Sequence, residues 1–347
     1  MRTAATALAE RPAPPAGRMI RMMKRALAGC LALGLAAAAV APVAADELPG
    51  IKVGTLKFGT VNWELAVISE GLDRKHRFIL ERVDFADKDA TSIALQSGEV
   101  DAIVTDWIWV AAQRKLGHNY TFVPFSRAVG AVMADPAKGI RSVADLAGRS
   151  IGIAGGADDK SWVLLQAYAR KTAGLELKDK ADVQFGAPPL LNELALRGKL
   201  DAVLNFWNFN ARLKSRGFVP VISIRDILPE LGLESDPPLL GWVFAERWAT
   251  ENPALARGLI DASYEAKRLM KSDDAVWDRL RPMMDAEDDV LFQALKEGFR
   301  AGAPDGYRHQ DIAAAEGAFA LMRQVDPASV GNLEALPDGT FWSGYWK

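Results

Sequence analysis

Cysteine and histidine are scarce in this sequence of 347 residues. It holds one cysteine, Cys30, and three histidines. Cys30 lies in an N-terminal segment with the pattern of a cleaved leader, so the chain left after cleavage would have no cysteine. That absence excludes disulfides, thiolate metal sites and cysteine nucleophiles together.

The three histidines are poorly placed for catalysis. His76 lies in the basic turn RKHR, His118 follows a predicted helix end, and His309 precedes the last predicted helix. None of them is next to a candidate nucleophile. The sequence also has neither a phosphate-binding P-loop nor a dinucleotide fingerprint. We therefore expect no enzymatic activity and no cofactor.

Excess positive charge is absent as well. The whole chain has a formal net charge of −2. Six basic residues and one acidic residue lie in residues 1–45, so the rest carries about −7. A chain of this charge lacks the basic surface that nucleic-acid binding requires. The predicted partners therefore exclude nucleic acid.

The first 45 residues have the layout of a secretory signal peptide. A basic stretch is followed by an apolar run over residues 26–40 and by the small-residue stretch APVAA at 41–45. The run is short for a transmembrane helix, which needs about 20 apolar residues. We predict cleavage before Asp46 and a periplasmic location. The segment LAGC at 27–30 leaves an alternative in which Cys30 is a lipoprotein anchor, but most of the apolar run follows this cysteine.

The remaining sequence alternates β-branched runs with amphipathic stretches, a pattern typical of parallel strands joined by helices. The first set of strands is predicted at residues 51–59, 78–85 and 102–105, with helices at 62–72 and 90–97. The second set is predicted at 150–154, 181–185 and 202–205, with helices at 161–173 and 190–197. Two more strands are expected at 219–224 and 239–244, followed by helices from residue 252 to the last at 312–325.

The restart of this pattern coincides with an internal repeat. Residues 98–111 (GEVDAIVTDWIWVA) align without gaps with residues 198–211 (GKLDAVLNFWNFNA). Glycine, Asp-Ala, tryptophan and the final alanine are identical at a spacing of 100 residues. Two similar α/β lobes explain this repeat, although a chance match of two common strand-helix units would look the same.

Three motifs give the chain a family resemblance. GEVDA at 98–102 and its counterpart at 198–202 each lead into a short strand, and DLAGRSIGIA at 145–154 opens the second half. With the exported start, these motifs resemble the nitrate/taurine/alkanesulfonate family of periplasmic solute-binding proteins. Some members of the wider group make the thiamine pyrimidine, which leaves an enzyme on the same fold as an alternative.

The resemblance implies a type II periplasmic binding protein fold, in which two α/β lobes joined by two crossovers enclose a ligand cleft. It also implies a small-molecule ligand, an inner-membrane ABC permease and its ATPase; we expect a monomer. The expected division is a signal peptide at 1–45, lobe 1 at 46–134 and 237–347, and lobe 2 at 135–236. The hinges are expected near residues 133–138 and 225–238.

Physical reasoning also locates the cleft, because ligands of open parallel sheets bind beyond the carboxyl ends of the strands. The turns that follow the predicted strands converge there. The candidate ligand-binding residues are Asn62, Trp63, Glu64, Asp106, Trp107, Gly156, Asp158, Ser161, Trp162, Asn205, Trp207 and Trp242. No metal site is predicted.

The chemistry of these turns suggests a ligand class. Their tryptophans offer apolar area with stacking geometry. The acidic residues Glu64, Asp106 and Asp158 would repel an anion. We therefore expect an aromatic or apolar solute that is neutral or cationic. Three alternatives stay open: the aspartates could cap helices, they could bind a hard cation or a metal complex, or the cleft rim could bind another protein.

Overall fold

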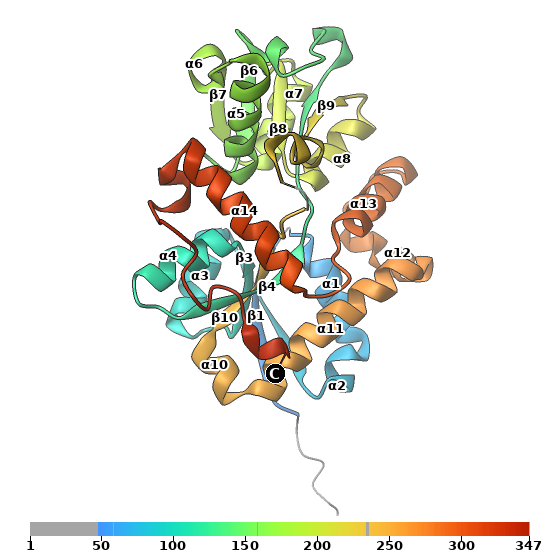
Figure 1. Cartoon of the computed structure of the whole chain (residues 1–347). Helices are drawn as coiled ribbons and strands as arrows, with labels where there is room; N and C mark the ends of the chain where they lie inside the picture. The colour runs from blue at the N-terminus through green and yellow to red at the C-terminus, as the bar shows by residue number, and fades with distance from the viewer. Residues whose placement is uncertain (1–47, 58, 158, 234–235, 347) are drawn as a thin grey trace, which may run out of the picture. The chain divides into compact units, whose positions relative to one another are not determined.

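The computed structural model describes residues 48–57, 59–157, 159–233 and 236–346 (Figure 1). The predicted signal peptide and Cys30 lie outside these residues, as do Asp158 and residues 234–235. The described part contains two sheets of five strands each, in the orders β2-β1-β3-β10-β4 and β7-β6-β8-β5-β9. We call the parts built on the first and the second sheet lobe 1 and lobe 2.

The first sheet has parallel pairing in one half and antiparallel pairing in the other. Strand β1 pairs in parallel with β2 and β3, whereas β10 runs antiparallel between β3 and β4. Its strands are β1 (Gly50–Leu56), β2 (Ile79–Phe85), β3 (Ala102–Thr105), β4 (Tyr120–Ser126) and β10 (Leu240–Ala245). Its connecting helices are α1 (Val61–Val67), continued by a π-turn at Ile68–Leu72, then α2 (Asp73–Lys75), α3 (Lys88–Ser97) and α4 (Trp107–Lys115).

The second sheet repeats this arrangement. Strand β6 pairs in parallel with β7 and β8, and β5 runs antiparallel between β8 and β9. Its strands are β5 (Ala131–Ala134), β6 (Ser150–Ala154), β7 (Asp182–Gly186), β8 (Ala202–Asn205) and β9 (Val219–Ser223). Its helices are α5 (Lys160–Ala173), α6 (Leu177–Lys180), α7 (Pro188–Leu196), α8 (Trp207–Ser215) and α9 (Ile224–Ile227).

The internal repeat is a real structural repeat. Strand β3 and helix α4 begin at residues 102 and 107, and their counterparts β8 and α8 begin at 202 and 207. The order β2-β1-β3 of one sheet recurs as β7-β6-β8 in the other. The expected α/β fold with two lobes is therefore confirmed.

The chain passes between the sheets twice. Strand β4 ends at Ser126 in the first sheet and β5 begins at Ala131 in the second, so the first crossover is residues 127–130. The hinge predicted at 133–138 was wrong, because Met133 pairs with Val203 inside the second sheet. The short β5 has no polar-apolar alternation, which is why the sequence did not reveal it. The second crossover lies between β9 and β10, as predicted.

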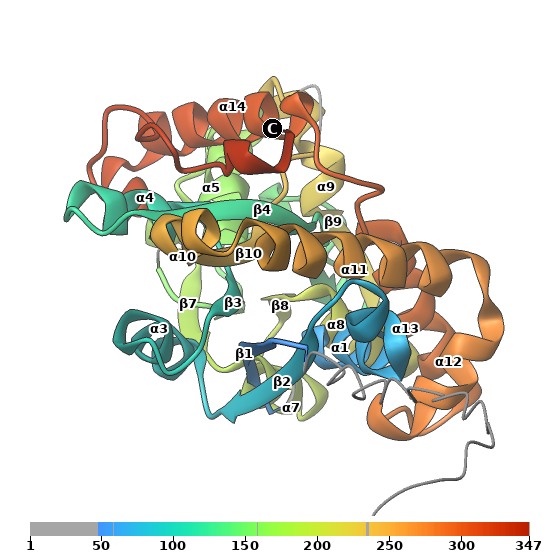
Figure 2. The same ribbon diagram turned by 90° about the horizontal axis from the view of Figure 1, so that it is seen from below.

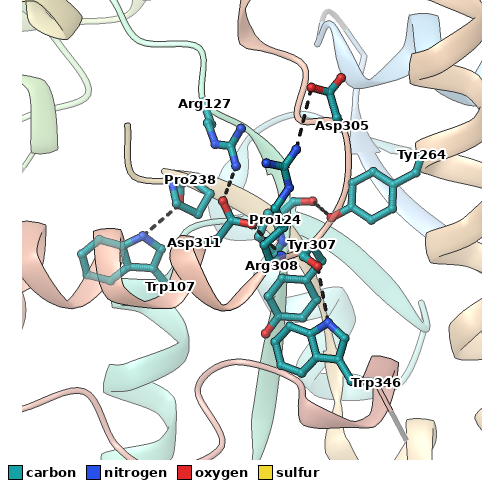
Figure 3. Close-up of polar contacts among 10 residues, drawn as sticks. All are labelled: Trp107, Pro124, Arg127, Pro238, Tyr264, Asp305, Tyr307, Arg308, Asp311 and Trp346. Atoms are coloured by element: carbon teal, nitrogen blue, oxygen red, sulfur yellow. Dashed lines mark hydrogen bonds and ion pairs between the residues drawn. The ribbon is translucent and has the colours of Figure 1, made fainter. Parts of the chain in front are cut away.

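Both crossovers are tied to lobe 1 (Figure 3). The Arg127 guanidinium forms an ion pair with Asp311, which is buried at the start of α14 (His309–Val325). The Trp107 indole N–H donates to the Pro238 carbonyl over 3.0 Å. The hydroxyl of Tyr264 donates to the Pro124 carbonyl, just before the first crossover. Each crossover therefore has at least one polar contact with an element outside lobe 2.

The C-terminal helices touch both lobes rather than lobe 1 alone. They are α10 (Glu246–Glu251), α11 (Pro253–Ser272), α12 (Asp274–Leu280), α13 (Asp289–Gly302) and α14. Helix α13 contacts α8 of lobe 2, and α14 contacts α5 of lobe 2. Figure 2 shows α11 along the first sheet and α13 beside α8. Short 3-10 turns lie at Pro136–Lys138, Ala144–Leu146, Pro229–Leu231, Arg281–Met283, Pro327–Val330 and Ser343–Trp346.

The aromatic C-terminal tail packs against lobe 1. Phe341 makes an edge contact with Phe122 at 5.3 Å between ring centroids, and Trp342 makes one with Phe244 at 5.2 Å. Within the described ranges, no helix combines the length and the apolar character needed to cross a membrane.

Gly130, in the first crossover, provides a test of this connection. A Cβ atom at this position would lie 1.9 Å from the carbonyl oxygen of Asn205 in lobe 2. Gly130→Ala should therefore push β5 away from β8 and lower the free energy of unfolding by about 1–3 kcal/mol, the usual cost of overpacking. Urea denaturation followed by circular dichroism measures this change.

Gly306→Ala is the matched control, because a Cβ atom there meets nothing within 4 Å. Equal stability of the two variants would contradict the close approach at the crossover.

Candidate functional site: the cavity between the lobes

A small cavity lies where the two lobes meet. Lobe 1 contributes Thr60, at the start of α1, and the ends of β4 and α13, while lobe 2 contributes Trp207 from the first turn of α8. The lining residues are Thr60, Phe125, Ser126, Ala128, Trp207, Lys267, Phe299 and Ala303. Its volume of about 10 Å³ holds about one water molecule. A larger solute can enter only if the lobes separate.

The floor of this cavity is a buried ion pair. Lys267 of α11 is 1% exposed, and its Nζ lies 2.6 Å from Oε2 of Glu64, which is fully buried on α1. The same ammonium donates to the Ser263 hydroxyl at 2.8 Å and lies 3.9 Å from the centre of the Phe125 ring. Lys267 lies four residues after Ser263 on α11. Their side chains come together because residues i and i+4 lie on the same face of a helix.

Ser263 links the ion pair to the lobe 1 core. Its hydroxyl donates to Glu64 Oε1 at 2.5 Å and accepts the indole N–H of Trp242 at 2.8 Å. Trp242 is buried and makes an edge contact with Phe125. Each polar group of this network therefore has a partner within the protein.

Burial acts on both members of the pair. Desolvation raises the pKa of the Glu64 carboxyl, and the opposite effect of Lys267 only partly offsets this rise. Desolvation likewise lowers the pKa of the Lys267 ammonium, and the opposite effect of Glu64 only partly offsets this fall. Whichever of the two groups holds the shared proton, the pair has no net charge. The floor of the cavity is therefore electrically neutral.

A second charged group lies at the carboxyl end of β3. Asp106 caps α4, its Oδ1 accepting the backbone N–H of Trp109 at 2.8 Å. Its Oδ2 lies 3.1 Å from Nζ of Lys88 and 3.0 Å from Nζ of Lys160. Burial opposes the ionisation of Asp106, but Lys160 and Lys88 outweigh it and hold its pKa well below the usual range. Asp106 is thus ionised and neutralised by protein groups.

The glycine turn of lobe 2 is shaped around a helix cap. Asp159 Oδ1 accepts the backbone N–H groups of Ser161 and Trp162 at the start of α5. Gly155 and Gly156 have φ angles of 93° and 105°, which favour glycine. A Cβ atom on Gly155 would lie 2.7 Å from the Asp159 carboxylate. The conformation of this turn therefore allows Asp159 to cap α5. The carboxylate of Asp159 has a structural role in this turn.

The structure places the predicted ligand-binding residues in three groups. The first group lies at the cavity. Trp207 lines the cavity, and Trp63 makes an edge contact with Trp207 at 6.1 Å between ring centroids. Glu64 forms the ion pair with Lys267, which also lines the cavity. Asp106 and Gly156 lie in the turns that precede α4 and α5, and Ser161 lies in the first turn of α5. Asn62, Trp107, Trp162, Asn205 and Trp242 are buried. Asp158 lies outside the described residues.

The buried members have contacts that account for them. Asn62 accepts from Thr55 and donates to the Leu56 carbonyl. Asn205 donates to Asn192 and to the Pro188 carbonyl. Trp107 packs on Phe319, and Trp162 makes an edge contact with Phe185. Direct ligand contact by these residues stays a prediction.

Sequence reasoning missed the cavity residues that come from distant elements. Lys267 lies on α11, Phe125 and Ser126 on the unpredicted β4, and Phe299 on α13. A lysine on the apolar face of α11, among Leu259, Ala262 and Ala266, was the one available signal. In the described part of the chain, no group of three or more His, Cys, Asp and Glu residues is placed to hold a metal ion.

The ion pair predicts a specific stability pattern. Lys267→Met should lower the free energy of unfolding by about 3–5 kcal/mol, because it leaves Glu64 buried without its partner. The double variant Glu64→Gln/Lys267→Met should recover part of this loss, since no charge is left behind. Urea denaturation of the four proteins in the cycle measures both effects.

Arg247→Met is the control, because Arg247 pairs with Glu251 on an exposed face of α10. Exposed pairs contribute about 1 kcal/mol or less. If Lys267→Met cost no more than Arg247→Met, the pair would not be the buried constraint described here.

Comparison with known proteins supports the fold and identifies the family. The fold is shared with the aliphatic sulphonate binding protein SsuA of Escherichia coli, at a TM-score of 0.66 and 18% identity over 86% of this chain and 93% of that chain. The SsuA protein of Xanthomonas axonopodis pv. citri, bound to MOPS, has a TM-score of 0.65 and 17% identity over 86% of this chain and 99% of that one.

A third structure is the ligand-binding component of an ABC-type import system from Staphylococcus aureus, with zinc bound. It has a TM-score of 0.65 and 15% identity, and the match covers 86% of this chain and 98% of that chain. At these identities the likenesses establish the fold. No curated protein matches the sequence.

The family is established by a match to part of the sequence. Residues 86–273 match the family described as NMT1/THI5 like. This match and the SsuA structures confirm the resemblance to nitrate/taurine/alkanesulfonate binding proteins that the sequence motifs indicated. Because the matched segment is more than half of the 347 residues, the chain belongs to the NMT1/THI5-like family.

Proposed function

We propose that this protein is the periplasmic substrate-binding component of an ABC importer and captures a small organic solute by closure of its two lobes. The observation that carries the proposal is the cavity lined by residues of both lobes, with Trp207 on one side and Thr60 and Phe125 on the other. A ligand that contacts both sides gains those contacts only in the closed state, so it shifts the population toward closure.

The chemistry of the walls supports an aromatic or apolar solute. Phe125, Trp207 and Phe299 supply ring faces and edges, and the hydroxyls of Thr60 and Ser126 offer a few directional hydrogen bonds. Binding sites for small organic molecules commonly combine these two features. The permease and ATPase of the importer are the partners that this role requires, and a catalytic step forms no part of the proposal.

The charge of the solute follows from the paired groups. The sequence suggested a neutral or cationic ligand because of its acidic turns, but Glu64 and Asp106 are both paired with lysines. A cation would meet the Lys267 ammonium, which already occupies a face of the Phe125 ring. An anion would have to compete with Glu64 for the same ammonium. We therefore propose a solute without net charge.

A thermal-shift screen tests this function. The protein would be unfolded and refolded to remove any bound solute, then mixed with neutral aromatics, sulfonates, amines and metal ions. A ligand at 100 times its Kd adds about 2.7 kcal/mol of stability, which raises Tm by several degrees. A neutral aromatic should give the largest shift. Silence across the panel would favour the alternative of an accessory protein that binds another protein.

Trp207→Ala should weaken binding of the solute found in this way more than tenfold. Among the described residues that line the cavity, Trp207 is the one that lobe 2 contributes. Its Tm without solute should change little beside that of a core variant, since the indole is only partly buried. Isothermal titration calorimetry measures the Kd.

Trp346→Ala is the matched control. That indole is 38% exposed, stacks on His309 and is not part of the cavity lining. Unchanged affinity in Trp207→Ala would contradict the position of the site.

A further inference from the structure

Two direct contacts join lobe 1 to lobe 2. One involves the segment after β3, and the other involves the equivalent segment after β8. The first is ionic: Asp106 of lobe 1 lies 3.0 Å from Nζ of Lys160, the first residue of α5 in lobe 2. The Asp106 side chain is 6% exposed and that of Lys160 is 16% exposed, so water screens this pair little. The same carboxylate oxygen also binds Lys88, which belongs to lobe 1.

The second contact is aromatic. Trp207 of lobe 2 meets Trp63 of lobe 1 edge to face, with ring centroids 6.1 Å apart and ring planes at 86°. The indole also lies against α13 at Gly298, where a Cβ atom would be 2.6 Å from its Cε3. Next to it, the Arg212 guanidinium of α8 donates to the carbonyls of Met284 and Asp285 in lobe 1.

The repeat relates these two contacts to each other. Asp106 and Phe206 occupy equivalent positions, each directly before a helix that begins with tryptophan. The helices α1 and α5, which follow β1 and β6, are equivalent in the same way. In each contact, the segment after β3 or β8 in one lobe meets the segment after β1 or β6 in the other. The two copies differ in chemistry at these points: one is a charge pair and the other a pair of indoles.

We propose that the Asp106–Lys160 ion pair and the Trp63–Trp207 contact are two latches that hold the lobes closed through protein groups alone. Both latches would break if the lobes rotated apart at residues 127–130, whereas the Lys88–Asp106 pair lies within lobe 1 and would move with it. The protein therefore sets its own balance between open and closed forms, whatever solute it binds. This inference goes beyond the proposed function, since it concerns the lobe equilibrium and not the ligand.

The distance between the lobes tests the latches directly. Glu99 and Lys199 are exposed and equivalent, in the loops before β3 and β8. Spin labels on Glu99→Cys and Lys199→Cys, with Cys30→Ser to remove the single native cysteine, report the lobe separation by electron double resonance. Without added solute, Lys160→Gln should raise the ratio of open to closed molecules about tenfold, as expected for loss of a charge-assisted hydrogen bond.

Lys75→Gln is the control, because it removes an ammonium from an ion pair with Glu265 that lies within lobe 1. It should leave the distance distribution unchanged. Gly298→Ala should increase the open fraction independently of charge, because the new methyl group displaces the Trp207 ring.

The proposal is overturned if Lys160→Gln leaves the distance distribution unchanged, or if Lys75→Gln changes it equally. It is also overturned for the aromatic latch if Gly298→Ala leaves the lobes as they are. Since no solute enters these measurements, a failed thermal-shift screen would not affect them.

Discussion

The structure depends on one topological constraint: the chain crosses between its two sheets twice, and each crossing places an antiparallel strand in a parallel sheet. Strand β5 joins the sheet of lobe 2 and β10 returns to that of lobe 1, each inserted between two other strands. Each inserted strand pairs on both of its edges, so removing it from its sheet would break two sets of strand pairings. The chain therefore connects the two sheets at residues 127–130 and between β9 and β10, and segments that follow β1, β3, β6 and β8 contact one another across the lobes. The cavity, the paired charges and the contacts between lobes all follow from this geometry.

Within that space the charged side chains neutralise one another. Glu64 pairs with Lys267 and Asp106 with Lys88 and Lys160, so the acidic turns of the sequence do not produce an acidic cleft. Buried ion pairs contribute little net stability, yet removing one partner is costly. Such pairs are therefore better understood as devices that fix the shape and the neutrality of the site. In the function proposed above, selectivity depends on the aromatic walls and the few hydroxyls of the cavity.

Much of the fold could be predicted from the sequence, and the reason is local periodicity. The strands at 102–105, 150–154 and 202–205 were predicted with the bounds they have, because short apolar runs follow GxVDA-like turns or precede a glycine turn. The 100-residue repeat predicted the two lobes. Strand β4 was missed because Pro124 lies within it, and β5 because it is short and has no polar-apolar alternation. The site was predicted less well: Trp207 and Glu64 were named, but Lys267, Phe125 and Phe299 reach the cavity only through tertiary packing. Charge pairing across lobes, as in Asp106 and Lys160, is likewise invisible in a linear pattern.

The central claim is that a neutral organic solute binds between Trp207 of one lobe and Thr60 and Phe125 of the other. The most direct test is a crystal structure of the protein with the solute that stabilises it most. The account predicts electron density for the solute in contact with Trp207 and Phe125, with the Glu64–Lys267 pair intact beneath it. Density at a different place, such as the groove on lobe 2 lined by Arg141, Tyr168 and Asp226, would contradict it. So would a solute whose charged group separates Lys267 from Glu64.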